Sequence, residues 1–156
     1  MRHMADRYFD DFAVGDTFET ATVVVTAEDI SDFARRFDPQ PWHLDLATAA
    51  ASPFGGLAAS GWHTTALTMR LIVDSGFLRA TGILGLGVDD LRWLKPVRPG
   101  DTLRVRGEVL FLDPPIGGKR TGIMRVQLTT IDQHDEAVQR EVAILYVPRR
   151  AHRSTT

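Results

Sequence analysis

The amino-acid sequence predicts a single α+β domain in which an antiparallel β-sheet wraps around one long helix. The helix is predicted by residues 57–74, which are apolar or small at nearly every position. The sheet is predicted by the C-terminal half, where β-branched stretches alternate with turn sequences. A buried helix followed by antiparallel strands is typical of the α+β class. Since no repeat or linker divides the chain, we expect one domain at residues 8–148 between flexible ends at 1–7 and 149–156.

The N-terminal part predicts one strand and one helix. Residues 18–26 are rich in threonine and valine, which favours a strand. Thr26 is the predicted N-cap of the following helix, because Asp29 three residues later can complete a capping box. The helix should end at Asp38, since Pro39 cannot continue it.

Residues 38–45, which read Asp-Pro-Gln-Pro-Trp-His-Leu-Asp, are the most informative segment. The two prolines disfavour a helix and restrict the unfolded chain, so the loop should be rigid. It therefore presents an acid, Asp38, and an imidazole, His43, close together. An ordinary turn capped by Asp38 explains these residues equally well when they are taken alone. A short helical turn is expected at residues 44–51, before Ser52-Pro53.

The predicted central helix carries little charge, so we expect it to be buried on all faces. Ser60 and Gly61 lie near its start, where unpaired N–H groups and the helix dipole can stabilise a developing oxyanion. Gly61 is explained equally well as a residue that allows close helix packing. His63 is expected to be a core histidine whose hydrogen bonds are satisfied.

The later strands are expected at residues 103–111, 123–131 and 138–147, joined by hairpin connections at 113–118 and 133–136. Residues 82–87 have glycine spacing that resembles a dinucleotide loop, but no helix follows, so we expect a turn leading into a strand. An antiparallel sheet of this size does not close on itself, so its two outer strands have unpaired backbone N–H and C=O groups. Pairing of edges between two copies predicts a homodimer or a multiple of it.

Composition excludes several classes of function. Eighteen Lys and Arg against 20 Asp and Glu give a net charge of −2, which disfavours binding to nucleic acid or a membrane surface. The absence of cysteine excludes disulfides, thiol nucleophiles and thiolate metal sites. The five histidines have no zinc-site spacing. Without an apolar run of about 18 residues or a signal peptide, a soluble cytoplasmic protein is expected.

An ordered set of motifs resembles the MaoC-like dehydratases, which are similar to R-specific enoyl-CoA hydratases and share the hotdog fold. The set comprises residues 37–45, the pair at 60–61, and residues 95–103, which read Lys-Pro-Val-Arg-Pro-Gly-Asp-Thr-Leu. The resemblance covers residues 8–147. Two positions depart from the family pattern, because Gln40 replaces an asparagine and Ser60 replaces a common histidine.

The resemblance implies an acyl-CoA thioester substrate and a reversible hydration without metal or redox cofactor. Asp38 and His43 would hold the water that adds to C3 of a 2-enoyl thioester, and Gly61, with Ser60 beside it, would form the oxyanion site. The helix serine of some relatives falls near Met69, so no catalytic serine is assigned. Arg92 and Lys95 are explained either as coenzyme A phosphate contacts or as surface charges.

Two other functions remain open from the sequence. A hotdog thioesterase would use Asp38 to direct water at C1 of the thioester. A non-catalytic acyl-thioester binding protein would explain Gln40 and Ser60 as marks of a lost active site. The pairing of Asp38 with His43 favours hydration, because both protons of the reaction then have a carrier.

Overall fold

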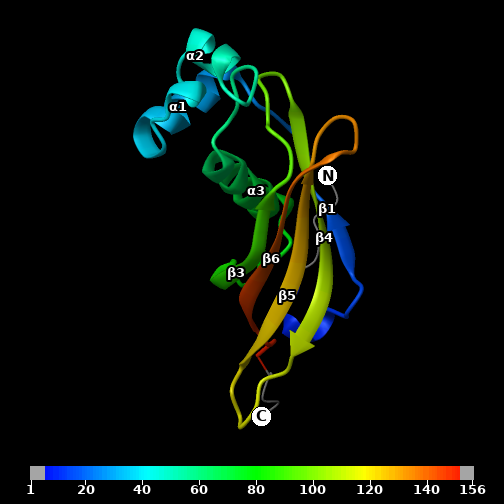
Figure 1. Ribbon diagram of the computed structural model, residues 1–156. Coiled ribbons are helices and arrows are strands. Elements are labelled where there is room, and N and C mark those ends of the chain that lie inside the picture. The colour runs from blue at the N-terminus through cyan, green and yellow to red at the C-terminus, as the bar shows by residue number, and fades with distance from the viewer. Residues whose placement is uncertain (1–5, 152–156) are drawn as a thin grey trace.

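A computed structural model describes residues 6–151 and confirms the predicted α+β class. A six-stranded antiparallel sheet curves around helix α3 (Figure 1). Five strands follow the order β1-β4-β5-β6-β3. The short strand β2 pairs with β4, as β1 does, and is not part of that order. The strands are β1 (Thr17–Glu19), β2 (Val23–Val24), β3 (Leu84–Trp93), β4 (Thr102–Asp113), β5 (Thr121–Ile131) and β6 (Ala137–Pro148).

The helices gather at one end of the sheet and across its inner face (Figure 1). They are α1 (Ala27–Phe37), α2 (Leu46–Ala51) and α3 (Gly61–Ser75), with short 3₁₀ turns η1 (Phe9–Asp11) and η2 (Pro41–His43). The predicted capping box of α1 is confirmed: the Asp29 N–H donates to Thr26 Oγ1 and the Thr26 N–H donates to Asp29 Oδ2, each over 3.1 Å. Gly76, with a φ of 73°, adopts the left-handed conformation that ends α3.

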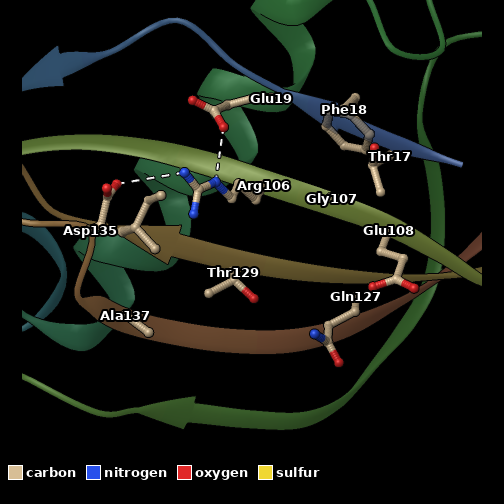
Figure 2. A pocket seen from close by; sticks show the side chains of 11 residues that line it. Thr17, Phe18, Glu19, Arg106, Gly107, Glu108, Gln127, Thr129, Asp135 and Ala137 are labelled. Atoms are coloured by element: carbon tan, nitrogen blue, oxygen red, sulfur yellow. Dashed lines mark hydrogen bonds and ion pairs between the residues drawn. The ribbon is translucent and has the colours of Figure 1, made fainter. Parts of the chain in front are cut away.

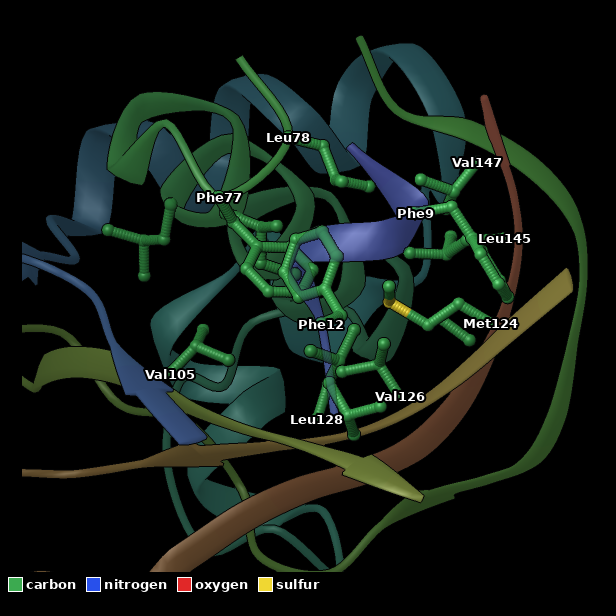
Figure 3. Close-up of a cluster of buried hydrophobic side chains, with 14 residues drawn as sticks. Phe9, Phe12, Phe77, Leu78, Val105, Met124, Val126, Leu128, Leu145 and Val147 are labelled. Carbon is green, nitrogen blue, oxygen red and sulfur yellow. The ribbon is translucent and has the colours of Figure 1, made fainter. Parts of the chain in front are cut away.

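The sheet is held to α3 by an apolar core between them (Figure 3). Two strand glycines make room for aromatic rings in this core. A Cβ added at Gly107 would lie 2.0 Å from the Phe18 ring, and one added at Gly122 would lie 2.4 Å from the Phe9 ring. The rings thus take the space of the missing side chains. The buried cluster contains Phe9, Phe12, Leu71, Ile72, Phe77, Leu78, Val105, Val109, Met124, Val126, Leu128, Ala143, Leu145 and Val147.

A second apolar cluster packs the helical end of the molecule onto the sheet. Ile30 of α1 and Ala49 of α2 are fully buried there against Leu103 of β4 and Val97. This cluster fixes the segment between α1 and α2, which carries the Asp38 and His43 side chains, relative to the start of α3.

Three predictions about elements were wrong in detail. The strand expected at 18–26 is divided into β1 and β2, because the Thr20 hydroxyl accepts a hydrogen bond from the Val105 N–H (2.9 Å) where strand pairing is interrupted. The loop at 38–45 includes the 3₁₀ turn η2, since proline is well suited to a first helical position.

The central helix differs most from its prediction. Residues 57–60 are not helical, and the Ala59 N–H donates to the Val97 carbonyl (2.9 Å) instead of starting a helix. The helix is also not buried on all faces, because Trp62, Met69 and Val73 are about half exposed along one side. The buried residues of the helix are His63, Thr64, Thr68, Leu71 and Ile72.

Within the described residues, no helix has the length and apolar character needed to cross a membrane. The predicted domain limits at 8 and 148 stay predictions. Residues 1–5 and 152–156, which make up most of the two ends expected to be flexible, lie outside the described part of the chain.

Candidate active site

Asp38 is placed by the end of α1. It is the C-cap residue, and its N–H donates to the Ala34 carbonyl. Pro39 prevents another helical turn, so the chain leaves the helix here and the Asp38 carboxylate is directed toward α3. The side chain remains partly exposed, at 23%.

His43 lies at the end of η2 and is almost completely buried. Its Nδ1 is 2.6 Å from the carbonyl oxygen of Ala58, which can only accept a hydrogen bond. Nδ1 therefore carries a proton, which makes Nε2 the nitrogen that can accept a hydrogen bond in the neutral form of the ring. Nε2 lies 3.4 Å from Asp38 Oδ2. The structure thus brings the two side chains of the proline-rich loop together, as their shared loop predicted.

Ser60 joins this pair to the start of α3. Its hydroxyl donates to Asp38 Oδ2 over 2.6 Å and accepts from the Trp62 N–H over 3.2 Å, so it caps the helix and orients the carboxylate at once. Ser60 is fully buried and is not among the residues that line the neighbouring cavity. Gly61 does line it, and among the described residues no hydrogen bond engages the Gly61 N–H.

A cavity of about 380 Å³ lies in front of these groups. All three tryptophans of the chain reach it, so an apolar and aromatic wall faces the Asp38 and His43 side chains. Such a mixture of apolar wall and a few convergent polar groups is typical of small-molecule sites. The lining consists of Asp38, Gln40, Trp42, His43, Phe54, Ala59, Gly61, Trp62, Thr64, Trp93, Leu94, Lys95, Pro96, Val97 and Val138.

Comparison with known proteins identifies the family. Residues 11–131 match the family described as the MaoC like domain. The chain belongs to the MaoC-like family. Its architecture is the hotdog fold, as the motifs implied.

Three relatives illustrate the similarity of this MaoC-like domain to known proteins. The crystal structure of a MaoC-like dehydratase from Rhodospirillum rubrum has 48% identity and a TM-score of 0.89, covering 93% of this chain and 99% of that chain. The uncharacterized protein YdeM of Bacillus subtilis is 35% identical over 137 residues, 87% of this chain and 96% of that protein. The 3-hydroxybutyryl-CoA dehydratase of Methylorubrum extorquens is 30% identical over 148 residues, 92% of this chain and 85% of that protein.

Two cavity features of the MaoC-like domain were missed from the sequence. Trp93, at the end of β3, covers Gly61, because a Cβ added at Gly61 would lie 2.4 Å from the indole ring. The Arg98 guanidinium donates to the carbonyls of Phe54, Gly56 (2.8 Å) and Leu57 (3.2 Å). Arg98 thereby fixes the loop that places Phe54 in the cavity wall. The motif at residues 95–103 includes Arg98 but gave it no role, and nothing in the sequence indicated Trp93.

The two basic residues considered for phosphate binding are both paired. Lys95 lines the cavity but donates to Asp132 and Glu136, each over 2.7 Å, and these hydrogen bonds raise the pKa of its ammonium group. Arg92 pairs with Asp90 over 3.0 Å on the exposed side of β3. Both side chains therefore have acidic partners within the chain.

His63 is buried as predicted, but its hydrogen bonding is not satisfied. Its ring stacks on Phe33 of α1 at 4.8 Å, and its Nδ1 has no hydrogen-bond partner among the described residues. Burial lowers the pKa of the imidazole, and the carboxylate of Asp29 opposes that shift.

A wider hollow of about 730 Å³ lies on the outer face of the sheet, opposite α3 (Figure 2). Three of its charged side chains, Glu19, Arg106 and Asp135, are joined in ion pairs. Arg106 is 2.9 Å from Glu19 and 3.6 Å from Asp135, and Arg104 pairs with the same two carboxylates. The described residues also contain no cluster of metal-binding side chains. The smaller cavity at the start of α3 is therefore the candidate active site.

Proposed function

We propose that this MaoC-like protein is a hydro-lyase that reversibly adds water to the double bond of a 2-enoyl-CoA. The observation that carries the proposal is the joint placement of Asp38, His43 and Gly61 around one cavity. The 3-hydroxybutyryl-CoA dehydratase among its relatives supports the same class of reaction and a coenzyme A thioester as substrate.

The Asp38 and His43 geometry suits the positioning of a water molecule. An ionised Asp38 and a neutral His43 offer two acceptors 3.4 Å apart, so a water can donate one hydrogen to each. Its lone pair then faces C3 of the substrate. During addition, the pair takes one proton from the water and delivers one proton to C2, while oxygen bonds to C3. The reverse sequence removes water from a 3-hydroxyacyl thioester.

The start of α3 would stabilise the charge that develops on the thioester oxygen. Within residues 6–151 the Gly61 N–H has no hydrogen-bond partner, and it lies in the first turn of a 15-residue helix, whose dipole adds positive potential at that end. A carbonyl oxygen placed against this N–H becomes enolate-like during attack at C3. Ser60 is proposed to act through Asp38, as a positioning residue, and not through direct contact with the substrate.

The product of the reaction distinguishes this proposal from the two other candidate functions. The protein would be incubated with a 2-enoyl-CoA while the conjugated absorbance and free thiol are followed together. A hydratase lowers the absorbance without releasing thiol and yields a 3-hydroxyacyl-CoA. Thiol release at the same rate would identify a thioesterase, and binding without turnover would identify a non-catalytic acyl-thioester binding protein.

We also propose that the protein works as a homodimer through β3 and α3. Strand β3 is an outer strand of the sheet, and its apolar side chains Leu84, Leu86 and Val88 are half exposed. Helix α3 has a second half-exposed apolar side, formed by Trp62, Met69 and Val73. A second copy paired along β3 would cover both surfaces and satisfy the unpaired strand edge.

A further inference from the structure

Trp93 forms one wall of the candidate active-site cavity. It is the last residue of β3, and its indole ring lies on Gly61 at the start of α3. The ring also meets the edge of Trp62, with ring centroids 5.1 Å apart and an interplanar angle of 79°. The side chain is 48% exposed, and its buried side packs against the start of the helix, next to the point where a thioester carbonyl would bind.

The indole is held in place by a chain of hydrogen bonds behind it. Its Nε1–H donates to Thr65 Oγ1 over 3.3 Å, and Thr65 Oγ1 lies 2.9 Å from Gln139 Oε1. Gln139 is opposite Trp93 in the pairing of β3 with β6 and is fully buried. Its amide nitrogen contacts Thr68 Oγ1 and Glu141 Oε2, each at 3.3 Å.

The space behind the buried side of Trp93 is therefore polar and filled by paired groups. An alkyl chain that displaced the indole would separate Thr65 from its donor and would bury methylenes against Gln139 and Glu141. Leaving buried polar groups unpaired is costly, and it offsets the gain from burying the chain. The cavity in front of Trp93, about 380 Å³, is also near the small end of the roughly 300–1,000 Å³ range for ligand sites.

We propose that Trp93 is a specificity-determining residue that restricts the substrate to short acyl chains. This inference rests on the proposed hydratase function of the same cavity. The thioester carbonyl would lie at Gly61, and the acyl chain would extend only as far as the indole ring. Neither the family match nor the relatives' names assign an acyl-chain limit to this residue.

The test compares 2-enoyl-CoA substrates of four, six, eight and ten carbons in the wild-type protein and in Trp93→Ala. An open apolar tunnel would raise kcat/KM by about fourfold for each buried methylene. The wild type should instead lose at least about tenfold between four and ten carbons. Trp93→Ala should raise the ratio of ten-carbon to four-carbon kcat/KM by about tenfold or more, and Trp93→Phe should largely keep the wild-type preference because a ring remains.

Two further variants serve as controls. Phe111→Ala removes an exposed aromatic ring on β4 that does not line the cavity, and its chain-length profile should match the wild type. Trp93→Leu retains an apolar contact with Gly61 and replaces Trp93→Ala if the alanine variant does not fold. A wild-type kcat/KM that rises up to ten carbons, or an unchanged profile in the smaller variants, would overturn the proposal.

Binding of acyl-CoA tests the role of Trp93 separately from the proposed hydration reaction. Affinity for saturated acyl-CoA of the same lengths can be measured by quenching of tryptophan fluorescence, since all three tryptophans line the cavity and two remain in the variants. If no substrate is hydrated, the proposed reaction is wrong. The acyl-chain limit is then judged from affinity alone: weaker binding of long chains, relieved in Trp93→Ala, supports it, and equal or tighter binding of long chains contradicts it.

Discussion

The Ser60 hydroxyl makes two hydrogen bonds with different structural roles. It accepts from the Trp62 N–H as the N-cap of α3, and it donates to the Asp38 carboxylate. A hydrogen bond to a charged acceptor is stronger than one between neutral groups, so this contact should fix the orientation of Asp38. The serine that replaces a histidine in the family pattern is thus consistent with an intact active site.

Replacing Ser60 separates the two roles. Ser60→Ala removes the hydrogen bond to Asp38 and also the cap of α3. Ser60→Gly removes the same hydroxyl, but glycine is nearly as good as serine at the N-cap position. We expect Ser60→Ala to lose about 1 kcal/mol in the free energy of unfolding and Ser60→Gly to lose only a few tenths. Both should lower kcat by a similar factor, about tenfold, with little change in KM. An activity loss confined to the alanine variant would show that Ser60 only caps the helix.

Gly61 and Trp93 should be coupled in stability. Alanine normally favours a helix by about 0.5–1 kcal/mol over glycine, but here its Cβ would overlap the Trp93 ring. Gly61→Ala should therefore destabilise the protein by about 1–3 kcal/mol in the wild type. In the Trp93→Ala background the same change should be neutral or stabilising. Urea unfolding of the four proteins gives the coupling energy, and additive effects would contradict the contact.

Two buried titratable side chains outside the proposed chemistry should give opposite pH dependence. Burial lowers the pKa of His63 from 6.5, so its stabilising contribution is present above that value and is lost as the pH falls through the folded pKa. Burial raises the pKa of Glu141 from 4.5, so its contribution is present below that value and is lost as the pH rises through the folded pKa.

Glu141→Gln tests the second of these effects. Glutamine resembles the protonated acid and cannot ionise, so the variant should unfold at a higher temperature than the wild type near pH 8. Near pH 4 the two proteins should unfold at nearly the same temperature. Thermal unfolding followed by circular dichroism across this range makes the measurement, and a variant that is less stable at pH 8 would contradict a raised pKa for Glu141.

At the scale of elements, the sequence predicted best where local signals agree. The capping box of α1 lies within a few consecutive residues, and the β-branched stretches of β5 and β6 follow strand periodicity. The start of α3 was misplaced because Ala58 and Ala59 have high helix propensity but bond elsewhere: the Ala59 N–H donates to Val97, and the Ala58 carbonyl accepts from His43. These contacts cross between distant segments and leave no trace in local composition.

The residues of the candidate site also differ in whether local sequence could predict them. Asp38 and His43 were predicted to lie together because they share one short, proline-rich loop. Trp93 and Arg98 were not predicted as parts of the cavity, because their positions depend on how β3 and the following segment return to the start of α3. The exposure of one side of α3 was also missed, since a sequence of apolar residues does not reveal whether a helix face lacks a partner.

The loop that carries Phe54 depends on Arg98. The fork of a guanidinium can reach three carbonyls, whereas a lysine ammonium is a single point charge that cannot span them. Arg98→Lys should lower stability by about 1–3 kcal/mol and raise KM several-fold, with a smaller effect on kcat. Arg106→Lys, on the exposed outer face of the sheet, is the matched control and should change stability by less than about 0.5 kcal/mol. Equal effects of the two changes would argue against a clamping role for Arg98.

At the scale of the whole molecule, the exposed apolar surface of α3 and β3 predicts self-association. Met69→Glu places a charge in the middle of this surface without disturbing a buried contact of the single chain. Light scattering should give a dimer for the wild type and a monomer for Met69→Glu. Phe111→Glu places the same charge on an exposed ring of β4 and should leave the dimer intact. A monomeric wild type at micromolar concentration would contradict the proposed assembly.

The central claim is that Asp38 and His43 together move the protons of a hydration reaction. The most direct measurement is kcat for hydration of a four-carbon 2-enoyl-CoA by the wild type, Asp38→Asn and His43→Gln, with circular dichroism to check the fold. Because acid–base groups each contribute about 10²–10⁴-fold, each variant should lose activity by at least that lower factor while remaining folded. Folded variants that retain wild-type kcat would contradict the mechanism.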